Sequence, residues 1–147
     1  MDLTSRTVEI DQCNCFAVRK AARRISRLYD AFLQPIGLRI TQFLILATLA
    51  KAEQASVNAL AERLDLERTA MGKTLAPLLR DGLIRIDPAL DDRRSRIASL
   101  TLAGLDRYER ALPCWRAAQS ELAELNGQDR IDALRSELTS LTVQTGG

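Results

Sequence analysis

Two cysteines separated by one residue are the most reactive side chains that the sequence places close together. They form the run Cys13-Asn14-Cys15, and the third cysteine, Cys114, lies far along the chain. Thiolates exchange disulfides and bind soft metals, so the pair is a candidate for redox chemistry or metal binding. A zinc site needs about four ligands, and the chain has no histidine to complete one. We therefore predict no metal site.

Missing residue types exclude most kinds of enzyme. Without histidine there can be no Ser-His or Cys-His nucleophile pair. The 7 glycines form neither G-x-G-x-x-G nor G-x-x-x-x-G-K, so no phosphate cradle for a nucleotide is predicted. We expect a binding protein with no cofactor. A thiol redox enzyme using Cys13 and Cys15 is an alternative, although C-x-C differs from the usual C-x-x-C spacing.

A second group of candidate residues falls in two short, mainly cationic stretches. The residues are Arg68, Thr69, Gly72 and Lys73 in the first stretch and Arg93, Arg94 and Arg96 in the second. Cations and hydroxyls contact phosphates and base edges, and small residues allow a helix to approach DNA closely. The alternative is a solvated charged surface, because Asp91 and Asp92 neutralise part of the second stretch.

The elements that carry these residues are predicted to be mostly helical. Apolar residues recur at the spacing of amphipathic helices over residues 11–33, 41–49, 56–64 and 67–80. Thr41 and Ser56 are placed to cap the second and third of these helices. Gly82 is suited to the left-handed conformation that ends the fourth.

Beyond the fourth helix the pattern changes. Two β-prone runs, 83–86 and 96–100, flank a polar loop and predict a hairpin. Thr101 is placed to cap a long helix, in which Pro113 predicts a kink or a local break. After Gly127 a last helix carries apolar residues at heptad-like spacing, namely Ile131, Leu134, Leu138 and Leu141.

The order of these elements defines the fold class. Helix, helix, short turn, helix and hairpin form a winged helix-turn-helix, so we predict a mainly α fold with a small β-hairpin wing. In such a motif the second helix enters the major groove, which makes 67–80 the recognition helix. The basic loop at the wing tip suits phosphates or a narrow minor groove.

Length and composition describe one globular unit. The 147 residues suit a single domain over 1–147, and 46% hydrophobic with 27% charged residues is an ordinary globular balance. No apolar run approaches the roughly 18 residues of a membrane span. The N-terminal residues are acidic where a signal peptide would be basic and then apolar. We therefore expect a cytoplasmic protein without a membrane partner.

Four stretches of the sequence carry a family resemblance. They are Leu38-Arg39-Ile40-Thr41-Gln42-Phe43, Leu60-Ala61-Glu62-Arg63-Leu64-Asp65-Leu66-Glu67-Arg68-Thr69, Leu78-Leu79-Arg80-Asp81-Gly82-Leu83-Ile84, and Asp91-Asp92-Arg93-Arg94-Ser95-Arg96 followed by Leu100-Thr101. Together they resemble the MarR family, which consists of dimeric DNA-binding repressors or activators. The resemblance implies dimerisation helices over 11–34 and 102–143, and a DNA-binding core over 38–101.

The resemblance also implies partners and a function. The partners are double-stranded DNA with a pseudo-palindromic operator, a second copy of the chain, and a small-molecule or oxidant effector near the dimer interface. Family pockets lie between the first, second and fifth helices, where Tyr29 and Phe43 are candidate lining residues. The predicted function is a homodimeric transcription regulator, a repressor modulated by a small molecule or by thiol oxidation. A helical protein-interaction module without DNA binding is the alternative.

The start of the chain is similar to the organic-hydroperoxide-sensing branch of that family. Cys15 matches the reactive cysteine of the branch, and Tyr29 matches a tyrosine that contacts the thiolate across the dimer. Arg19 replaces a second tyrosine of the branch, so a cation could stabilise the thiolate instead. Cys13 is a candidate resolving thiol. The alternative is that both cysteines are inert packing residues.

Overall fold

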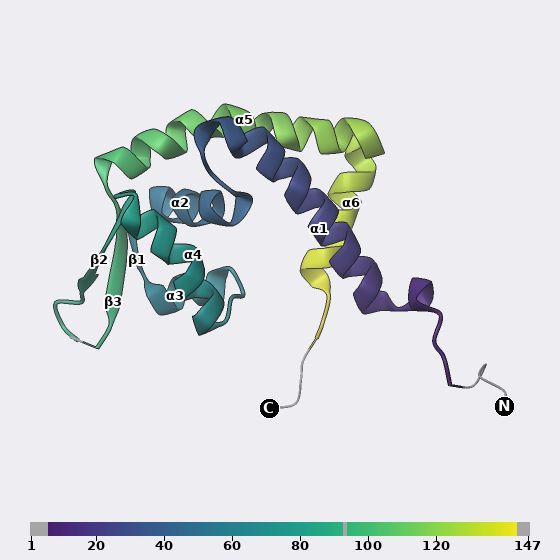
Figure 1. Ribbon diagram of the computed structural model, residues 1–147, viewed down its shortest axis with the longest axis horizontal. Coiled ribbons are helices and arrows are strands. Elements are labelled where there is room, and N and C mark those ends of the chain that lie inside the picture. The colour runs from purple at the N-terminus through teal and green to yellow at the C-terminus, as the bar shows by residue number, and fades with distance from the viewer. Residues whose placement is uncertain (1–5, 93, 144–147) are drawn as a thin grey trace.

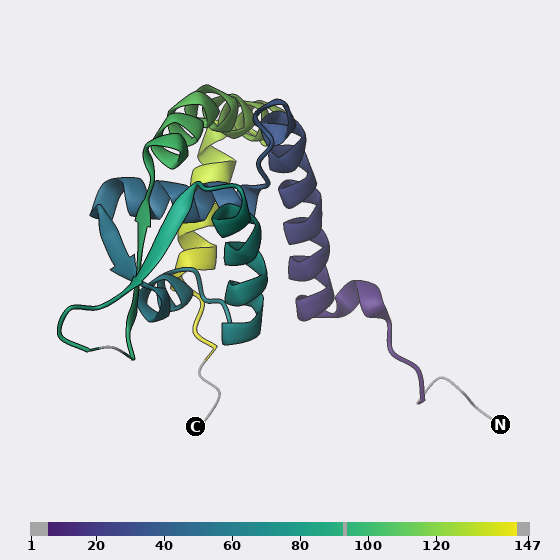
Figure 2. The same ribbon diagram turned by 60° about the vertical axis from the view of Figure 1, so that its left-hand side comes forward.

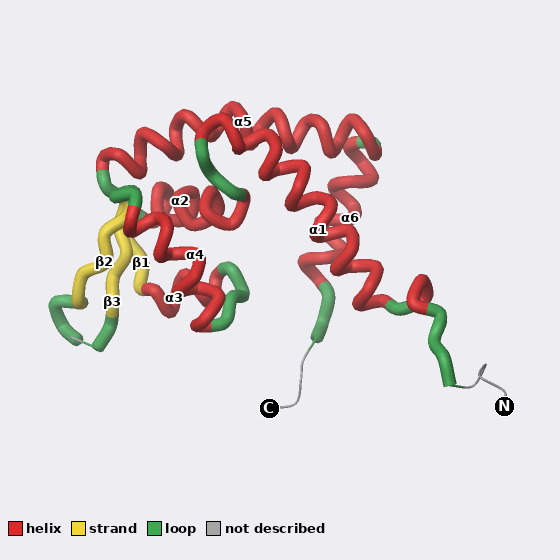
Figure 3. Tube along the Cα trace, in the orientation of Figure 1, coloured by secondary structure: helices red, strands yellow, loops and turns green. Residues whose placement is uncertain are grey.

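The long helix α5 (Leu102–Asn126) joins two parts of the molecule. In the computed structural model, which describes residues 6–92 and 94–143, one end of α5 meets a lobe of short helices and strands, and the other lies beside two further helices (Figures 1 and 3). The other elements are η1 (Ile10–Gln12), α1 (Asn14–Leu33), η2 (Gln34–Ile36), α2 (Ile40–Ala52), β1 (Gln54–Ser56), α3 (Val57–Arg63), α4 (Arg68–Arg80), β2 (Ile84–Pro88), β3 (Arg96–Leu100) and α6 (Gln128–Ser140). The predicted fold class is confirmed, while Arg93, one of the predicted DNA contacts, lies outside the described residues.

Helices α1 and α6 form the second part together with the C-terminal half of α5. Helix α1 packs along α5, and the chain turns from α5 into α6 at Gly127, whose φ is 92°. The first helix begins later than predicted, since residues 10–12 form a separate 3-10 turn and Cys13 is the N-cap of α1. Figure 2 shows the segment before α1 extending away from the rest of the molecule.

The wing belongs to a three-stranded antiparallel sheet with the strand order β1-β3-β2. At the centre of β3, Ala98 pairs with Ala55 of β1 and with Ile86 of β2. The predicted hairpin is confirmed as the pair β2 and β3, while β1 is a third strand that was not predicted. Strand β1 has only three residues, too few for an alternation of apolar and polar side chains to predict a strand. It becomes a strand because β3, distant in sequence, offers it a free edge.

Two of the predicted helix caps are present. The Ser56 hydroxyl accepts a hydrogen bond from the Ala59 backbone N–H at 3.0 Å, and the Thr101 hydroxyl accepts one from the Gly104 N–H at 3.0 Å. Each bond satisfies an amide that the first helical turn leaves without a partner. Helix α5 continues through Pro113, so the local break that proline could cause does not occur.

The start of α2 differs from the prediction. Thr41 lies inside the first turn rather than at the cap, so the predicted cap is wrong. Instead, Asp30 of α1 accepts a hydrogen bond from the Ile40 N–H at 2.8 Å, and the Gln42 side chain accepts one from the Arg39 N–H at 3.0 Å. A carboxylate from a neighbouring helix thus stabilises the positive end of α2.

The hydrophobic core lies where α5 crosses α2 and extends to α4 and the sheet. The buried residues of this cluster are Leu33, Leu38, Phe43, Ile45, Leu46, Leu49, Leu60, Met71, Leu75, Leu78, Leu83, Ile84, Ala98 and Ala111. Phe43 stacks on Tyr108 and Trp115 of α5, with ring centroids 5.7 and 5.9 Å apart. These contacts fix α5 on the lobe of short helices and strands.

No single helix in the described part of the chain is long and apolar enough to span a membrane. Helices α1 and α2 reach that length and composition only as a pair, and the pair is bent by 71°.

Candidate DNA-binding surface

Helix α4 has a polar face because its large apolar residues fall on one side. Met71, Leu75 and Leu78 are buried in the core. The turn that leads into α4 contains Asp65 in the left-handed conformation, with φ of 53°. The predicted recognition residues Arg68, Thr69, Gly72 and Lys73 are all exposed. The structure thus leaves this face of α4 free to meet a ligand, and its contact with DNA stays a prediction.

The tip of the wing is shaped by Asp92. Its carboxylate accepts hydrogen bonds from the Arg94 backbone N–H at 2.9 Å and from the Ser95 hydroxyl at 3.4 Å. The Ser95 N–H in turn donates to the Asp92 carbonyl at 3.1 Å. In the described part of the wing, the Asp92 carboxylate thus binds a backbone amide and a hydroxyl group. The Arg94 side chain consequently stays exposed.

A cleft of about 420 Å³ lies between α4 and the wing. Arg68 from the start of α4 lines it together with Arg94 and Arg96 from the wing. The fold thus brings together three cations that the sequence holds in two separate stretches. Ser56 and Asn58, at the start of α3, also line the cleft. They were not predicted as site residues, although Asn58, a polar residue beside the predicted cap Ser56, was a usable signal.

Within the part of the chain that the structure describes, no acidic residue forms an ion pair with the cations of this surface. Among the described residues, the ion pairs involve Arg80, Arg85, Arg110 and Arg135, and none involves Arg68, Lys73, Arg94 or Arg96. Unpaired charges of one sign that share a cleft attract a polyanion and repel one another. The charge and position of the cleft therefore suit phosphate groups, and their binding stays a prediction.

Three of the predicted residues lie outside this cleft. Thr69, Gly72 and Lys73 do not line it, and they extend the exposed surface along α4. Thr69 and Lys73 have side chains of the kinds that reach base edges in a groove, and the arginines of the cleft have side chains of a kind that binds phosphates. The surface thus has two parts with different chemistry.

The predicted sensor residues lie along α1 and do not meet within one chain. Cys13 and Cys15 are free, exposed thiols, and the Cys13 sulfur accepts a hydrogen bond from the Phe16 N–H at 3.5 Å. Arg19, one turn after Cys15, is also exposed. Tyr29 lies about 21 Å further along the axis than Cys15, at a rise of 1.5 Å per residue. A contact between Cys15 and Tyr29 therefore requires a second chain.

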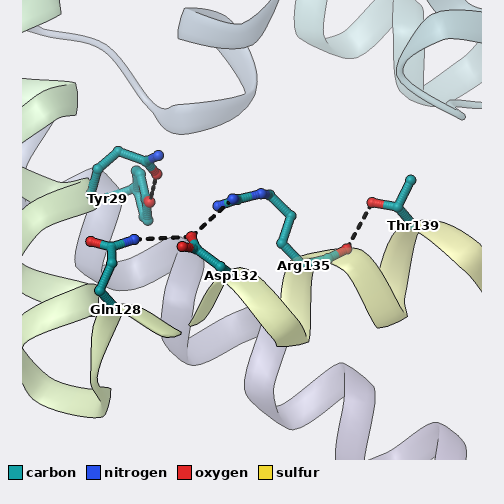
Figure 4. Close-up of polar contacts among 6 residues, drawn as sticks. Tyr29, Gln128, Asp132, Arg135 and Thr139 are labelled. Carbon is teal, nitrogen blue, oxygen red and sulfur yellow. Dashed lines mark hydrogen bonds and ion pairs between the residues drawn. The ribbon is translucent and has the colours of Figure 1, made fainter. Parts of the chain in front are cut away.

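Tyr29 is buried, and its hydroxyl donates a hydrogen bond to the Gln119 side chain of α5 (Figure 4). Burial raises the pKa of Tyr29 above its ordinary value of 10.0, and the positive charge of Arg135 acts in the opposite direction. Asp132 holds that arginine, accepting from it at 3.0 Å and from Gln128 at 2.9 Å (Figure 4). Tyr29 is thus a neutral donor already engaged within its own chain.

Helix α6 has no buried residue within its described span. In the predicted heptad stripe, Leu134, Leu138 and Leu141 are 43%, 45% and 60% exposed, and Ile131 is half-buried. An apolar cleft of about 450 Å³ separates α6 from α1 and the end of α5. A large contiguous apolar surface of this kind marks an interaction site rather than a solvated face.

This arrangement defines a class of protein: a winged helix-turn-helix regulator whose terminal helices expose an apolar surface. The model of the MarR family matches residues 38–95, which span α2 to the wing. The similarity to solved regulators extends beyond these residues, over most of the chain. The chain belongs to the MarR family.

Three relatives illustrate the match. The M. tuberculosis transcriptional regulator MosR, solved in complex with DNA, is 33% identical with a TM-score of 0.74, over 88% of this chain and 100% of that one. An organic hydroperoxide resistance transcriptional regulator of Bacillus subtilis is 28% identical over 98 residues, 67% of each chain. An HTH-type transcriptional regulator of Staphylococcus aureus is 29% identical over 83 residues, 56% of this chain and 57% of that relative. The last alignment thus spans little more than half the relative's length. All three relatives are regulators. They support the prediction that the chain is a binding protein rather than an enzyme.

Proposed function

We propose that this protein is a homodimeric DNA-binding transcription regulator that acts as a repressor. The observation that carries the proposal is the cleft in which Arg68, Arg94 and Arg96 meet without acidic partners. A relative that is 33% identical was solved with DNA, which supports the same ligand class here. Such a protein acts where the chromosome lies, so we place it in the cytoplasm.

In the proposed complex, α4 enters the major groove and the wing contacts the backbone beside it. Lys73 and Thr69 reach base edges, and Arg68, Arg94 and Arg96 hold phosphates. Because two α4 helices of a symmetric dimer face the same side of DNA, the operator is a pseudo-palindrome with half-sites about one helical turn apart. Residues 38–101 form the DNA-binding core of each protomer.

The proposed dimer uses the two terminal regions, 11–34 and 102–143. The exposed leucines of α6 and the apolar cleft beside α1 support this interface, because a lone terminal helix with such a stripe is marginal in water. A second copy that covers the stripe would bury Leu134 and Leu138. It would also bring Cys15 of one chain within reach of groups on the other.

The test of DNA binding starts from a random duplex pool, since the operator is unknown. Wild-type protein should enrich a pseudo-palindromic sequence, and Arg68→Gln should bind the enriched duplex more weakly. Lys51→Gln, which changes a cation outside the cleft, is the matched control and should bind as wild type does. Failure of wild type to enrich any sequence would favour the helical interaction module without DNA binding.

We propose further that oxidation of Cys15 weakens DNA binding. Support comes from its exposure in the first turn of α1, where the helix dipole favours an anion, and from the similarity to a hydroperoxide resistance regulator. An organic hydroperoxide converts the thiol to a sulfenic acid and is itself reduced to the alcohol. Cumene hydroperoxide should release wild-type protein and Cys13→Ser from the enriched duplex, but not Cys15→Ser. Release of all three would mean that the signal acts elsewhere.

A further inference from the structure

An apolar cleft of about 450 Å³ lies open between α1, the end of α5 and α6. The part of the chain that the structure describes does not fill it. Leu125 and Leu134, two of its lining residues, are 66% and 43% exposed. The other large aliphatic residues of the lining are Ile25, Leu28, Leu122 and Ile131. Apolar surface that is gathered in one cleft and left open to water marks a site that another molecule covers.

Two exposed arginines line the same cleft, Arg24 of α1 and Arg130 of α6. Among the described residues, neither arginine takes part in an ion pair, and no acidic residue lines the cleft. A purely aliphatic occupant would cover these two cations without pairing them, which costs free energy. The lining therefore suits an occupant that presents aliphatic side chains together with a carboxylate.

The segment before α1 carries this combination of side chains. Val8 and Ile10 are 82% and 53% exposed, and Glu9 stands between them. Figure 2 shows this segment extending away from the rest of the molecule. Among the described residues, the Glu9 carboxylate forms no ion pair. Val8, Glu9 and Ile10, here called the N-terminal arm, are thus complementary to the cleft in both polarity and charge.

The N-terminal arm does not reach the cleft of its own chain. Its direction is set by the 3-10 turn of η1 and by Cys13 at the N-cap, which lead it away from α1 (Figure 2). Ile25, in the cleft, lies 11 residues beyond Asn14 at the start of α1, which is about 17 Å along the helix at a rise of 1.5 Å per residue. The arm of a second chain can enter the cleft without folding back over that length.

We infer that the N-terminal arm of a second copy of this chain occupies the cleft. Val8 and Ile10 cover the aliphatic lining, and Glu9 pairs with Arg24 or Arg130. The inference rests on the proposed homodimer and names the segment that each chain contributes to its partner. In a dimer with twofold symmetry the exchange is reciprocal, so both clefts are filled and both arms lose their exposed apolar surface. The leucine stripe of α6 from the second copy is the competing occupant, and the experiment separates the two.

Cross-linking between introduced cysteines tests which chain supplies the arm. Val8→Cys and Leu125→Cys are made in separate copies of a chain whose native cysteines are replaced. One copy carries an affinity tag, so a product that joins the two variants is recognised by its mass. After co-expression, a short bismaleimide should give this joint product. Leu102→Cys replaces Leu125→Cys in the control and should give none, because Leu102 is 87% exposed at the opposite end of α5.

Placing Val8→Cys and Leu125→Cys in one chain distinguishes the two sources of the arm. Cross-linked chains of dimer mass agree with exchange between copies, whereas a link within a monomer would assign the cleft to the chain's own arm and overturn the inference. A dimer that gives no product in either arrangement would also overturn it and would assign the cleft to the α6 stripe. If light scattering finds wild type at its chain mass of 16.3 kDa, the proposed dimer fails first, before any variant is compared.

A charge exchange tests the ion pair independently of the cysteine variants. Glu9→Arg should raise the dissociation constant of the dimer about three- to thirtyfold, because two exposed ion pairs per dimer are lost. Adding Arg24→Glu or Arg130→Glu, whichever arginine faces the arm, should bring the constant back within about threefold of wild type. Glu62→Arg on α3, outside the cleft, is the matched control and should dimerise as wild type does. A wild-type dissociation constant for Glu9→Arg would contradict the exchange of arms.

Discussion

The salt dependence of DNA binding is expected to report how many phosphates the arginines of the cleft contact. Each protomer of the proposed dimer carries Arg68, Arg94 and Arg96 in its cleft. The dimer therefore offers six arginines to the phosphates of the DNA backbone. Each neutralised phosphate contributes about −0.9 to the slope of log K against log salt, so the cleft should contribute about −5.4. Arg94→Gln removes one contact per protomer, which should reduce the slope by about 1.8.

The measurement is fluorescence anisotropy on the enriched duplex between about 50 and about 200 mM salt. The control is Arg110→Gln on α5, an exposed arginine whose partner Asp106 lies 3.7 Å away. Helix α5 lies across α2 from α3 and α4 (Figures 1 and 2), so this change should leave the slope as it was. A wild-type slope for Arg94→Gln would refute the assignment of the wing arginine to a phosphate. If Arg94→Gln and Arg110→Gln reduced the steepness of the salt dependence equally, the location of the phosphate contacts in the arginine cleft would be refuted.

Three further predictions concern packing, assembly and pH. Gly104→Ala should lower the free energy of unfolding by roughly 2–4 kcal/mol, because its Cβ would lie 1.9 Å from a backbone oxygen; urea denaturation measures the loss. Leu134→Asp should shift the protein in light scattering from a dimer toward its chain mass of 16.3 kDa, and a dimer of unchanged affinity would contradict the α6 interface. Because burial raises the pKa of Tyr29, the folded chain keeps a proton that the unfolded chain releases. The contribution of Tyr29 to stability should therefore be fully present below pH 10.0 and be lost as the pH rises above it, and Tyr29→Phe should lessen the fall.

Features that depend on neighbouring residues could be predicted from the sequence. Ser56 and Thr101 cap helices with their own side chains, and Gly82 takes the left-handed conformation with φ of 71° just after α4. The recognition helix was predicted from the spacing of its apolar residues alone. In each of these cases the deciding contacts lie within one helical turn of the residue.

Features that depend on distant residues could not be predicted. The cap of α2 comes from Asp30 on another helix, and β1 exists only because β3 reaches its edge. The cleft likewise depends on the fold that carries Arg94 back to Arg68, so the sequence predicted two basic stretches but not their meeting. The distance from Cys15 to Tyr29 of a second chain would depend on the proposed dimer, which no residue spacing within one chain determines.

Helix α5 connects the proposed sensor region to the DNA-binding lobe. At its start, the Thr101 hydroxyl donates to the Gly82 carbonyl at 2.6 Å and the Thr101 N–H donates to the Leu83 carbonyl at 3.1 Å. In its second half, Gln119 accepts the hydrogen bond of Tyr29. Helix α5 is continuous between these two points. At Gly104 it packs so closely against Leu83 that an added Cβ would not fit.

A change at Tyr29 is therefore expected to move α4 and the wing together with α5, because Thr101 at the start of α5 is hydrogen-bonded to the segment that joins α4 to β2. Each protomer would keep the shape of its arginine cleft while the distance between the two α4 helices changed. The helical repeat of DNA is fixed. A dimer whose two α4 helices are one DNA turn apart therefore binds, and a dimer with another spacing of its α4 helices binds poorly. An oxidant or ligand at the interface then needs only to favour one spacing over the other to control binding.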